Sequence, residues 1–206
     1  MFCLSVLSFS LFADLQWQTQ FMHDGDIVTF TFKEKEKGKE KEKVCSFIAG
    51  FSGFNVGFDG DHHVKNFGAK LSASQVSSNS IQVRCDLTLE DNSGNSGIHS
   101  QMAAHVTVVA WVGTSNQACY LGQANDMCGK TVSLNAGKKV IAAAACINSF
   151  VIGYPGDDHH VREVKAGVSA QNVSGTNQVN VNGSVGMKDD SGNHGGCSHL
   201  SAAVLA

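Results

Sequence analysis

Two Asp-His-His triplets are the residues of this chain best suited to chemistry. They are Asp61-His62-His63 and Asp158-His159-His160. Histidine and aspartate can bind metal ions and exchange protons near neutral pH. Neighbouring strand residues point to opposite faces, so the two histidines of one triplet are not expected to share a metal. Two interpretations stay open: an aspartate and one histidine face a ligand or a neighbouring subunit, or the triplet is a turn whose histidines hydrogen-bond to loop backbone.

Two oxygen-rich loops form a second pair of candidate sites. They read Asp91-Asn92-Ser93-Gly94-Asn95 and Asp189-Asp190-Ser191-Gly192-Asn193. Such loops can bind Ca²⁺, but both lack the downstream glutamate and the regular spacing of an EF-hand. Asn, Asp, Ser and Gly are also ordinary hairpin residues. We therefore keep a turn and an ion or sugar contact as alternatives, with Asp91, Asn92, Asn95, Asp189, Asp190 and Asn193 as candidate ligand-binding residues.

Other arrangements that could support chemistry are weaker. His194, Cys197 and His199 are close enough to suggest zinc, but a fourth ligand is not obvious. The sequence holds no GxSxG motif for a nucleophilic serine. Motifs that occur in two similar copies also argue against an enzyme, which normally needs one asymmetric constellation. We predict no catalytic residues, no metal and no cofactor, apart from the calcium alternative.

The elements that must position these residues come from an internal repeat. FNVGFDGDHHV at 54–64 matches FVIGYPGDDHHV at 150–161, and LEDNSGN at 89–95 matches MKDDSGN at 187–193. Upstream, GDIVTF at 25–30 matches GKTVSL at 129–134. Equal order and spacing indicate a duplicated unit. We expect an apolar segment at 1–14, a first repeat at 15–113 and a second at 114–206.

Both repeats have the apolar alternation of half-buried strands. Ile81, Val83, Cys85, Leu87 and Leu89 alternate with polar residues, as do the residues at 179–187. Clusters of Gly, Asn and Ser supply turns between such segments, and the chain shows no sustained helical stripe. The fold class we predict is all-β, with two tandem antiparallel β-sandwich repeats of the same type.

The charged tract Lys33–Lys43 (KEKEKGKEKEK) has a place in this scheme. A hairpin turning at Lys37-Gly38 would pair Glu36 with Lys39 and Lys35 with Glu40, so that opposite charges face each other. The same register would place Phe30 opposite Cys45 and Val28 opposite Phe47. A shorter hairpin in the second repeat, turning at Gly137-Lys138, would place Leu134 opposite Ile141. A flexible loop is the alternative for the charged tract.

Composition limits the possible partners. The 206 residues include 15 Lys+Arg and 18 Asp+Glu. Outside the charged tract, 9 basic and 14 acidic residues remain among 195, or about 12% charged, against roughly 25% in average domains. Nucleic acid is therefore not expected as a partner, because phosphate binding needs clustered Lys and Arg. Apolar runs shorter than about 18 residues predict no membrane span.

Several features predict a secreted protein. Residues 1–13 resemble the apolar part of a secretory signal, although an N-terminal strand is the alternative. Six of the seven cysteines follow this segment, an even number that permits disulfides, and Cys119 with Cys128 is the pair we expect. Asn172 and Asn182 lie in glycosylation sequons.

The order of these motifs resembles the H-type lectin domain. In the first repeat FNVGFDGDHHV is followed by KLSASQVSSNSIQV, a polar loop and HVTVVAWV, which ends with Trp111. The second repeat keeps GVSAQNVSGTNQVNV but lacks the tryptophan. The resemblance covers about 60 residues of each repeat. It implies a six-stranded antiparallel sandwich that trimerises and binds N-acetylgalactosamine-like sugars through loop Asp, His and aromatic side chains, Trp111 among them.

Two functions follow as expectations. The first is a secreted structural β-protein that self-associates into an extracellular layer or filament through sheet edges. Its basis is the low charge and a final strand expected to be short, because the second repeat stops at Val204-Leu205-Ala206 where the first continues through 108–112. Another subunit could fill that edge, for example with its apolar N-terminus. The alternative is a lectin-like carbohydrate-binding module.

Overall fold

The computed structural model describes residues 13–33, 36–37, 40–56, 63–97, 102–113, 120–140 and 142–206. These residues form strands and turns without any helix, and the strands pair in antiparallel sheets, which confirms the all-β prediction. The alternating residues Ile81, Val83 and Cys85 are completely buried, as their period of two requires.

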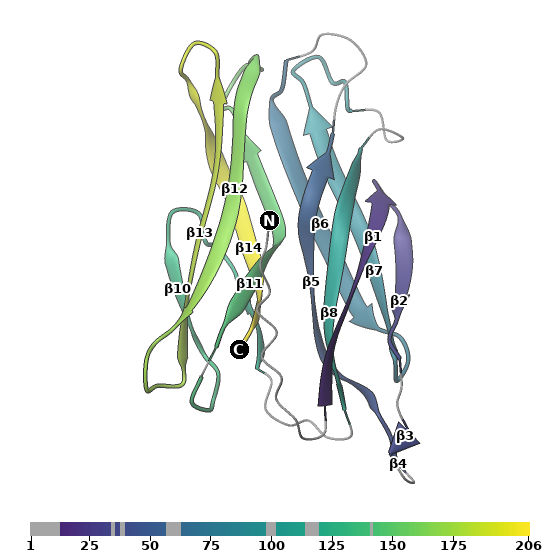
Figure 1. Ribbon diagram of the computed structural model, residues 1–206. Coiled ribbons are helices and arrows are strands. Elements are labelled where there is room, and N and C mark those ends of the chain that lie inside the picture. Colours follow the sequence, from purple (N-terminus) through teal and green to yellow (C-terminus); the bar gives the residue numbers. More distant parts are fainter. Residues whose placement is uncertain are drawn as a thin grey trace.

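The first half of the chain places six strands in two sheets. One sheet has the order β1–β8–β5, formed by β1 (Ala13–His23), β8 (Ala103–Gly113) and β5 (Lys43–Asn55). The other runs β2–β7–β6, formed by β2 (Ile27–Thr31), β7 (Ser80–Glu90) and β6 (Asn66–Gln75). In Figure 1 the first sheet lies in front of the second.

The second half pairs its six strands in the same order. β9 (Leu121–Ala124), β14 (His194–Leu205) and β11 (Ala144–Gly153) are neighbours, as β1, β8 and β5 are. β10 (Thr131–Asn135), β13 (Gln178–Asp189) and β12 (Val161–Asn172) repeat the order β2–β7–β6. The duplicated sequence therefore produces the same strand pairing twice.

One strand pair joins the two halves. β6 of the first half hydrogen-bonds to β11 of the second, with Phe67 opposite Ile152 and Lys70 opposite Ser149. This pair joins the sheets β2–β7–β6 and β11–β14–β9. A short contact between β13 and β14 adds β10, β13 and β12, which gives one nine-stranded sheet. Figure 1 shows the first half on the right and the second on the left.

Apolar side chains also cross between the halves. Phe150 on β11 is completely buried, and its ring lies 5.4 Å from that of Phe54 and 5.1 Å from that of Phe67. Both partners belong to the first half. The buried apolar residues form one contiguous cluster that includes side chains from both halves. Edge-to-face aromatic contacts of this kind add about 0.5–1.5 kcal/mol each beyond burial.

The predicted pairing of Phe30 with Cys45 and of Val28 with Phe47 is wrong. Phe30 lies opposite Ile81 and Val28 opposite Val83, because β2 pairs with β7. β5 pairs with β8, in the other sheet. The second-half counterpart fails likewise, since Leu134 lies opposite Val179. Equal apolar periods on two consecutive strands do not say whether the chain folds back within one sheet or crosses to the other.

The charged tract forms a small two-stranded ribbon in a different register. β3 (Glu36–Lys37) pairs with β4 (Glu40–Lys41), which places Glu36 opposite Lys41 and Lys37 opposite Glu40. The expected pairing of Glu36 with Lys39 is therefore wrong by two residues. In either register the backbone partner of each glutamate is a lysine, so charge alternation alone could not select the register. Gly38 and Lys39 lie outside the described residues.

The expectation of a short, uncovered last strand is also wrong. β14 has 12 residues against 11 in β8, and it lies between β11 and β9. β14 begins closer to its Asp-x-Ser-Gly-Asn loop than β8 does to the equivalent loop. The reason is that β14 starts as the second strand of a hairpin with β13, in which Lys188 pairs with His194. A free edge must therefore be sought on another strand.

Candidate functional site

His63 of the first Asp-His-His triplet meets the second triplet at one end of the join between the halves. We call the group His63, Asp158, His159 and His160 the histidine seam. Val64 and His159 exchange backbone hydrogen bonds of 2.8 and 3.1 Å, forming a bridge between the residues that precede β6 and β12. Equivalent segments of the two repeats are thereby brought into contact. Asp61 and His62 lie outside the described residues.

His63 and His160 occupy the same place in their triplets and touch each other. Their ring centroids are 3.9 Å apart in an edge-to-face arrangement. His63 Nδ1 also lies 3.6 Å from Asp158 Oδ1. Contact between equivalent residues is the mark of a self-complementary interface. The second-half triplet thus faces the first half of its own chain.

His159 faces the other way, into the second half. Its Nδ1 lies 2.7 Å from Asp189 Oδ2, and its ring stacks on Tyr154 with centroids 4.1 Å apart. Burial alone would raise the pKa of Asp189, but hydrogen bonds from Asn193 and His159 outweigh it and lower the pKa to about 2. Burial, with the nearby Asp189 charge, raises the pKa of Tyr154. Opposite orientations of neighbouring histidines agree with the strand argument.

The oxygen-rich loops are turns closed by their first aspartate. Asp189 Oδ1 accepts a hydrogen bond of 2.7 Å from the Asn193 backbone, and Oδ2 accepts another from the Asn193 side chain. Asp91 and Asn95 repeat both contacts, at 2.8 and 2.6 Å. Both side chains are buried, Asp91 at 7% and Asp189 at 2% exposed, and both carboxylates accept hydrogen bonds from their own loop. This is the chemistry of a hairpin turn.

Asn92 links the first loop to the second half. Its backbone N–H donates to Asp158 Oδ2 at 3.1 Å, and its side-chain amide donates to Asp157 Oδ1 at 3.0 Å. Lys65 donates to Asn92 Oδ1 at 2.8 Å. The equivalent residue of the second loop, Asp190, is exposed. These contacts identify the histidine seam and its loops as an interface within the chain.

The remaining predicted residues lie apart from the seam. Trp111 is on β8, and its indole N–H is one of three buried side-chain polar atoms without a hydrogen-bond partner among the described residues. Asn172 ends β12, and Asn182 is exposed in the middle of β13, where Thr131 donates a hydrogen bond to it. The structure does not bring these residues together.

The predicted disulfide is wrong. Cys128 is bonded to Cys197, 69 residues away, with Cα atoms 5.7 Å apart. Cys119 lies outside the described residues. The bond also removes Cys197 from the suggested zinc group, and no cluster of three potential metal ligands occurs among the described residues. Burial raises the pKa of the Cys85 and Cys146 thiols to about 12, so both are un-ionised at neutral pH.

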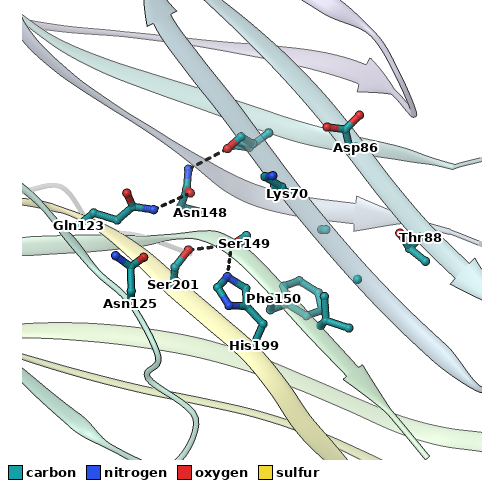
Figure 2. A pocket seen from close by; sticks show the side chains of 14 residues that line it. Lys70, Asp86, Thr88, Gln123, Asn125, Asn148, Ser149, Phe150, His199 and Ser201 are labelled. Atoms are coloured by element: carbon teal, nitrogen blue, oxygen red, sulfur yellow. Dashed lines mark hydrogen bonds between the residues drawn. The ribbon is translucent and has the colours of Figure 1, made fainter.

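A cavity on the joined sheet was not foreseen from the sequence. It has a volume of about 520 Å³ and lies over β7, β6, β11, β14 and the chain around β9. At its centre Ser149 Oγ lies 2.7 Å from both His199 Nε2 and Ser201 Oγ (Figure 2). Both serines are buried. The available signal was the polar residues at 149, 199 and 201, each of which is next to a buried apolar residue of its strand.

The Ser149–His199 contact resembles a nucleophile with its base, but it is incomplete. Acyl transfer also needs an acceptor that orients the histidine and donors that bind the developing oxyanion. No hydrogen bond orients His199 from its second nitrogen among the described residues, and Ser149 shares its hydroxyl with the buried Ser201. Among the described residues the group is therefore a hydrogen-bonded Ser149–His199 pair without the orienting acceptor that acyl transfer needs.

The sheet β1–β8–β5 presents aromatic side chains to solvent on one face. Trp17 and Phe21 on β1 are 56% and 50% exposed. Their cross-strand partners on β8 are Val109 and His105, and Leu15 lies opposite Trp111. Partners in an antiparallel pair share one face, so these side chains form a surface without acidic residues, lysine or arginine. Exposed apolar surface of this kind is typical of interaction sites.

Comparisons with known proteins identify no relative. No family model matches the chain, no curated protein matches its sequence, and no solved structure matches its fold. No helix among the described residues is long and apolar enough to cross a membrane. The function is therefore argued from the geometry of the molecule.

Proposed function

We propose that this protein is a secreted structural β-protein whose copies associate through sheet edges into an extracellular layer or filament. The observation that carries the proposal is the edge of β12. β6 and β12 hold equivalent places beside β7 and β13. The second edge of β6 is covered by β11, whereas β13 is the strand that pairs with β12 among the described residues.

The second edge of β12, which pairs with no strand among the described residues, is long and largely exposed. Residues 162–167 of β12 are all exposed, and Val164 is 42% exposed where its counterpart Phe67 is 6% exposed. The first part of the strand carries charged side chains of the kind that discourage pairing at a sheet edge, namely Arg162, Glu163 and Lys165. The following segment, 166–172, carries no charge. An unpaired, uncharged strand edge is a template for a strand of another chain.

Further features support association outside the cell. The aromatic face around Trp17 and Phe21 provides a second apolar surface. The Cys128–Cys197 bond is typical of oxidising compartments, in keeping with the signal-like residues 1–13. We further propose that the halves are two copies of one six-stranded sandwich, since their strands pair in the same order. Repetition of one unit suits a structural role.

A charged side chain introduced at the β12 edge tests whether copies associate through it. Ala166 is exposed and lies opposite Val185 of β13, so that Ala166→Lys puts an ammonium group on the apolar side of the edge. A strand added there would have to desolvate this charge. We expect the wild type to form oligomers in analytical ultracentrifugation and extended assemblies in electron microscopy. The variant should associate about 100-fold more weakly or worse.

A matched control is available on the same sheet. Ser184 is exposed on the middle strand β13, opposite Gly167, so Ser184→Lys adds an equal charge away from the edge. Its assembly should match that of the wild type. A wild type that stays monomeric at high concentration would refute self-association. Equal assembly of Ala166→Lys and wild type would show that the β12 edge takes no part.

A further inference from the structure

Strand β12 has one apolar and one polar face. Its even-numbered residues from 164 to 170 are apolar, and two of them, Val168 and Ala170, pack against the buried core. Its odd-numbered residues point to the other face and are charged, polar or glycine, namely Glu163, Lys165, Gly167, Ser169 and Gln171. A strand that extends the sheet beyond β12 must therefore place apolar side chains on the first face and polar side chains on the second.

The charges of β12 are confined to its first part. Arg162, Glu163 and Lys165 carry them, and residues 166–172 carry none. Two copies of β12 paired in parallel and in register would set each charged residue beside its own copy, and like charges in neighbouring positions destabilise a sheet. Antiparallel pairing instead brings the charged part of one copy to the uncharged part of the other.

Antiparallel pairing of β12 with itself allows few registers. Facing residues must both point their backbone groups at the partner strand, so a two-fold axis passes beside one residue, which then faces its own copy. An axis at Glu163 or Lys165 places like charges opposite each other. The regular part of β12 is 163–172, after the register shift against β13. Axes at Gly167 and Val168 give the longest overlap of this part.

The axis at Gly167 matches the side chains better. An axis at Val168 would place the apolar Val164 opposite the polar Asn172. With the axis at Gly167 every facing pair of the regular part on the core side is apolar, namely Val164 with Ala170 and Ala166 with Val168. The apolar face of the sheet would thus continue from one copy into the next without a polar interruption.

The polar face of this arrangement is also complementary. Glu163 lies opposite Gln171 of the second copy, whose amide N–H can donate to the carboxylate. Lys165 lies opposite Ser169, whose hydroxyl oxygen can accept from the ammonium group. Both charged residues therefore meet an uncharged hydrogen-bonding partner. Gly167 faces itself, and a Cβ at this position would meet no atom within 4 Å.

The first half of the chain shows that this edge accepts an antiparallel strand. β6 is the strand equivalent to β12, and its second edge pairs with β11. There Phe67 lies opposite Ile152 and is 6% exposed. The equivalent residue of β12 is Val164, which is 42% exposed. A second copy would cover in the second half what β11 covers in the first.

We infer that the β12 strands of two copies pair antiparallel about a two-fold axis at Gly167. The inference rests on the proposed association through the β12 edge and names the partner of that edge, which is the same strand of a second copy. Such a contact closes on itself and produces a dimer. Growth into a layer or filament then requires a second contact, for which the aromatic face around Trp17 and Phe21 is available.

Cysteine cross-linking tests the register. Gly167→Cys would face its own copy with Cα atoms about 4.5–5.5 Å apart, within the range of about 4.4–6.8 Å that a disulfide spans. Lys165→Cys and Ser169→Cys would face each other, whereas each lies four residues, or about 14 Å, from its own copy. Under mild oxidation Gly167→Cys should form a linked dimer alone, and the other two variants only when mixed. The wild type, with the same native cysteines, is the control.

Linked dimers are measured on non-reducing gels and by mass spectrometry. The yield of Gly167→Cys should exceed that of the wild type at least 10-fold, and adding Ala166→Lys should remove the excess. No excess in Gly167→Cys overturns the inference, as does equal linking of Lys165→Cys alone and in the mixture. If the wild type still assembles, association through the edge then stands with a different partner. A wild type that stays monomeric at high concentration overturns both proposals.

Discussion

Phe150 couples the two halves, and removing its ring should destabilise both. The ring belongs to β11 but is buried against Phe54 and Phe67 of the first half. A buried Phe→Ala change costs about 3–5 kcal/mol. In a chain of this length about 2–4 °C of Tm accompany each kcal/mol, so Phe150→Ala should lower Tm by roughly 6–20 °C.

Tryptophan fluorescence makes the coupling visible. Both tryptophans, Trp17 and Trp111, lie in the first half, so their emission reports the unfolding of that half, while far-UV circular dichroism reports all strands. We expect the two signals to change together in the wild type. In Phe150→Ala they should still coincide, at a lower denaturant concentration, although the substitution is in the second half.

The control is the neighbouring residue. Val151 is 38% exposed on the same strand, and Val151→Ala should change the free energy of unfolding by about 0.5 kcal/mol or less. An unchanged tryptophan midpoint in Phe150→Ala, with an earlier separate transition in circular dichroism, would refute the reasoning. The halves would then unfold independently, and the shared core would contribute no coupling.

Two further predictions concern the second half. The pKa of Asp189 is lowered to about 2, so the stability it contributes is complete above its unfolded pKa of about 3.9 and is lost as the pH falls toward 2. Asp189→Asn should therefore lower the urea midpoint at neutral pH and flatten its fall below about pH 4, and parallel pH profiles would contradict this. Reduction of the Cys128–Cys197 bond should cost about 4 kcal/mol for a closed loop of this length. Urea unfolding with and without dithiothreitol measures that loss, and Cys128→Ala should then show no effect of the reductant.

The sequence by itself determined the strands and the turns. Alternation at Ile81, Val83 and Cys85 requires a half-buried strand, because side chains repeat with a period of two. The Asp-x-Ser-Gly-Asn loops are turns for a local reason, since the aspartate side chain reaches backbone only four residues away. The repeat likewise predicted that the same elements would occur twice.

Only the tertiary structure decided how these elements combine. Whether β2 pairs with β5 or β7, and whether Cys128 bonds to Cys119 or Cys197, depends on contacts between residues far apart in the chain. Apolar periodicity is the same on either sheet, so it carries no such information. The β6–β11 join brings His63 against His160 and forms the cavity around Ser149 and Ser201, while β13 is the strand that pairs with β12 among the described residues. These features have one cause. β6 of the first half pairs with β11 of the second, whereas the equivalent pair, β12 with β5, is not made among the described residues.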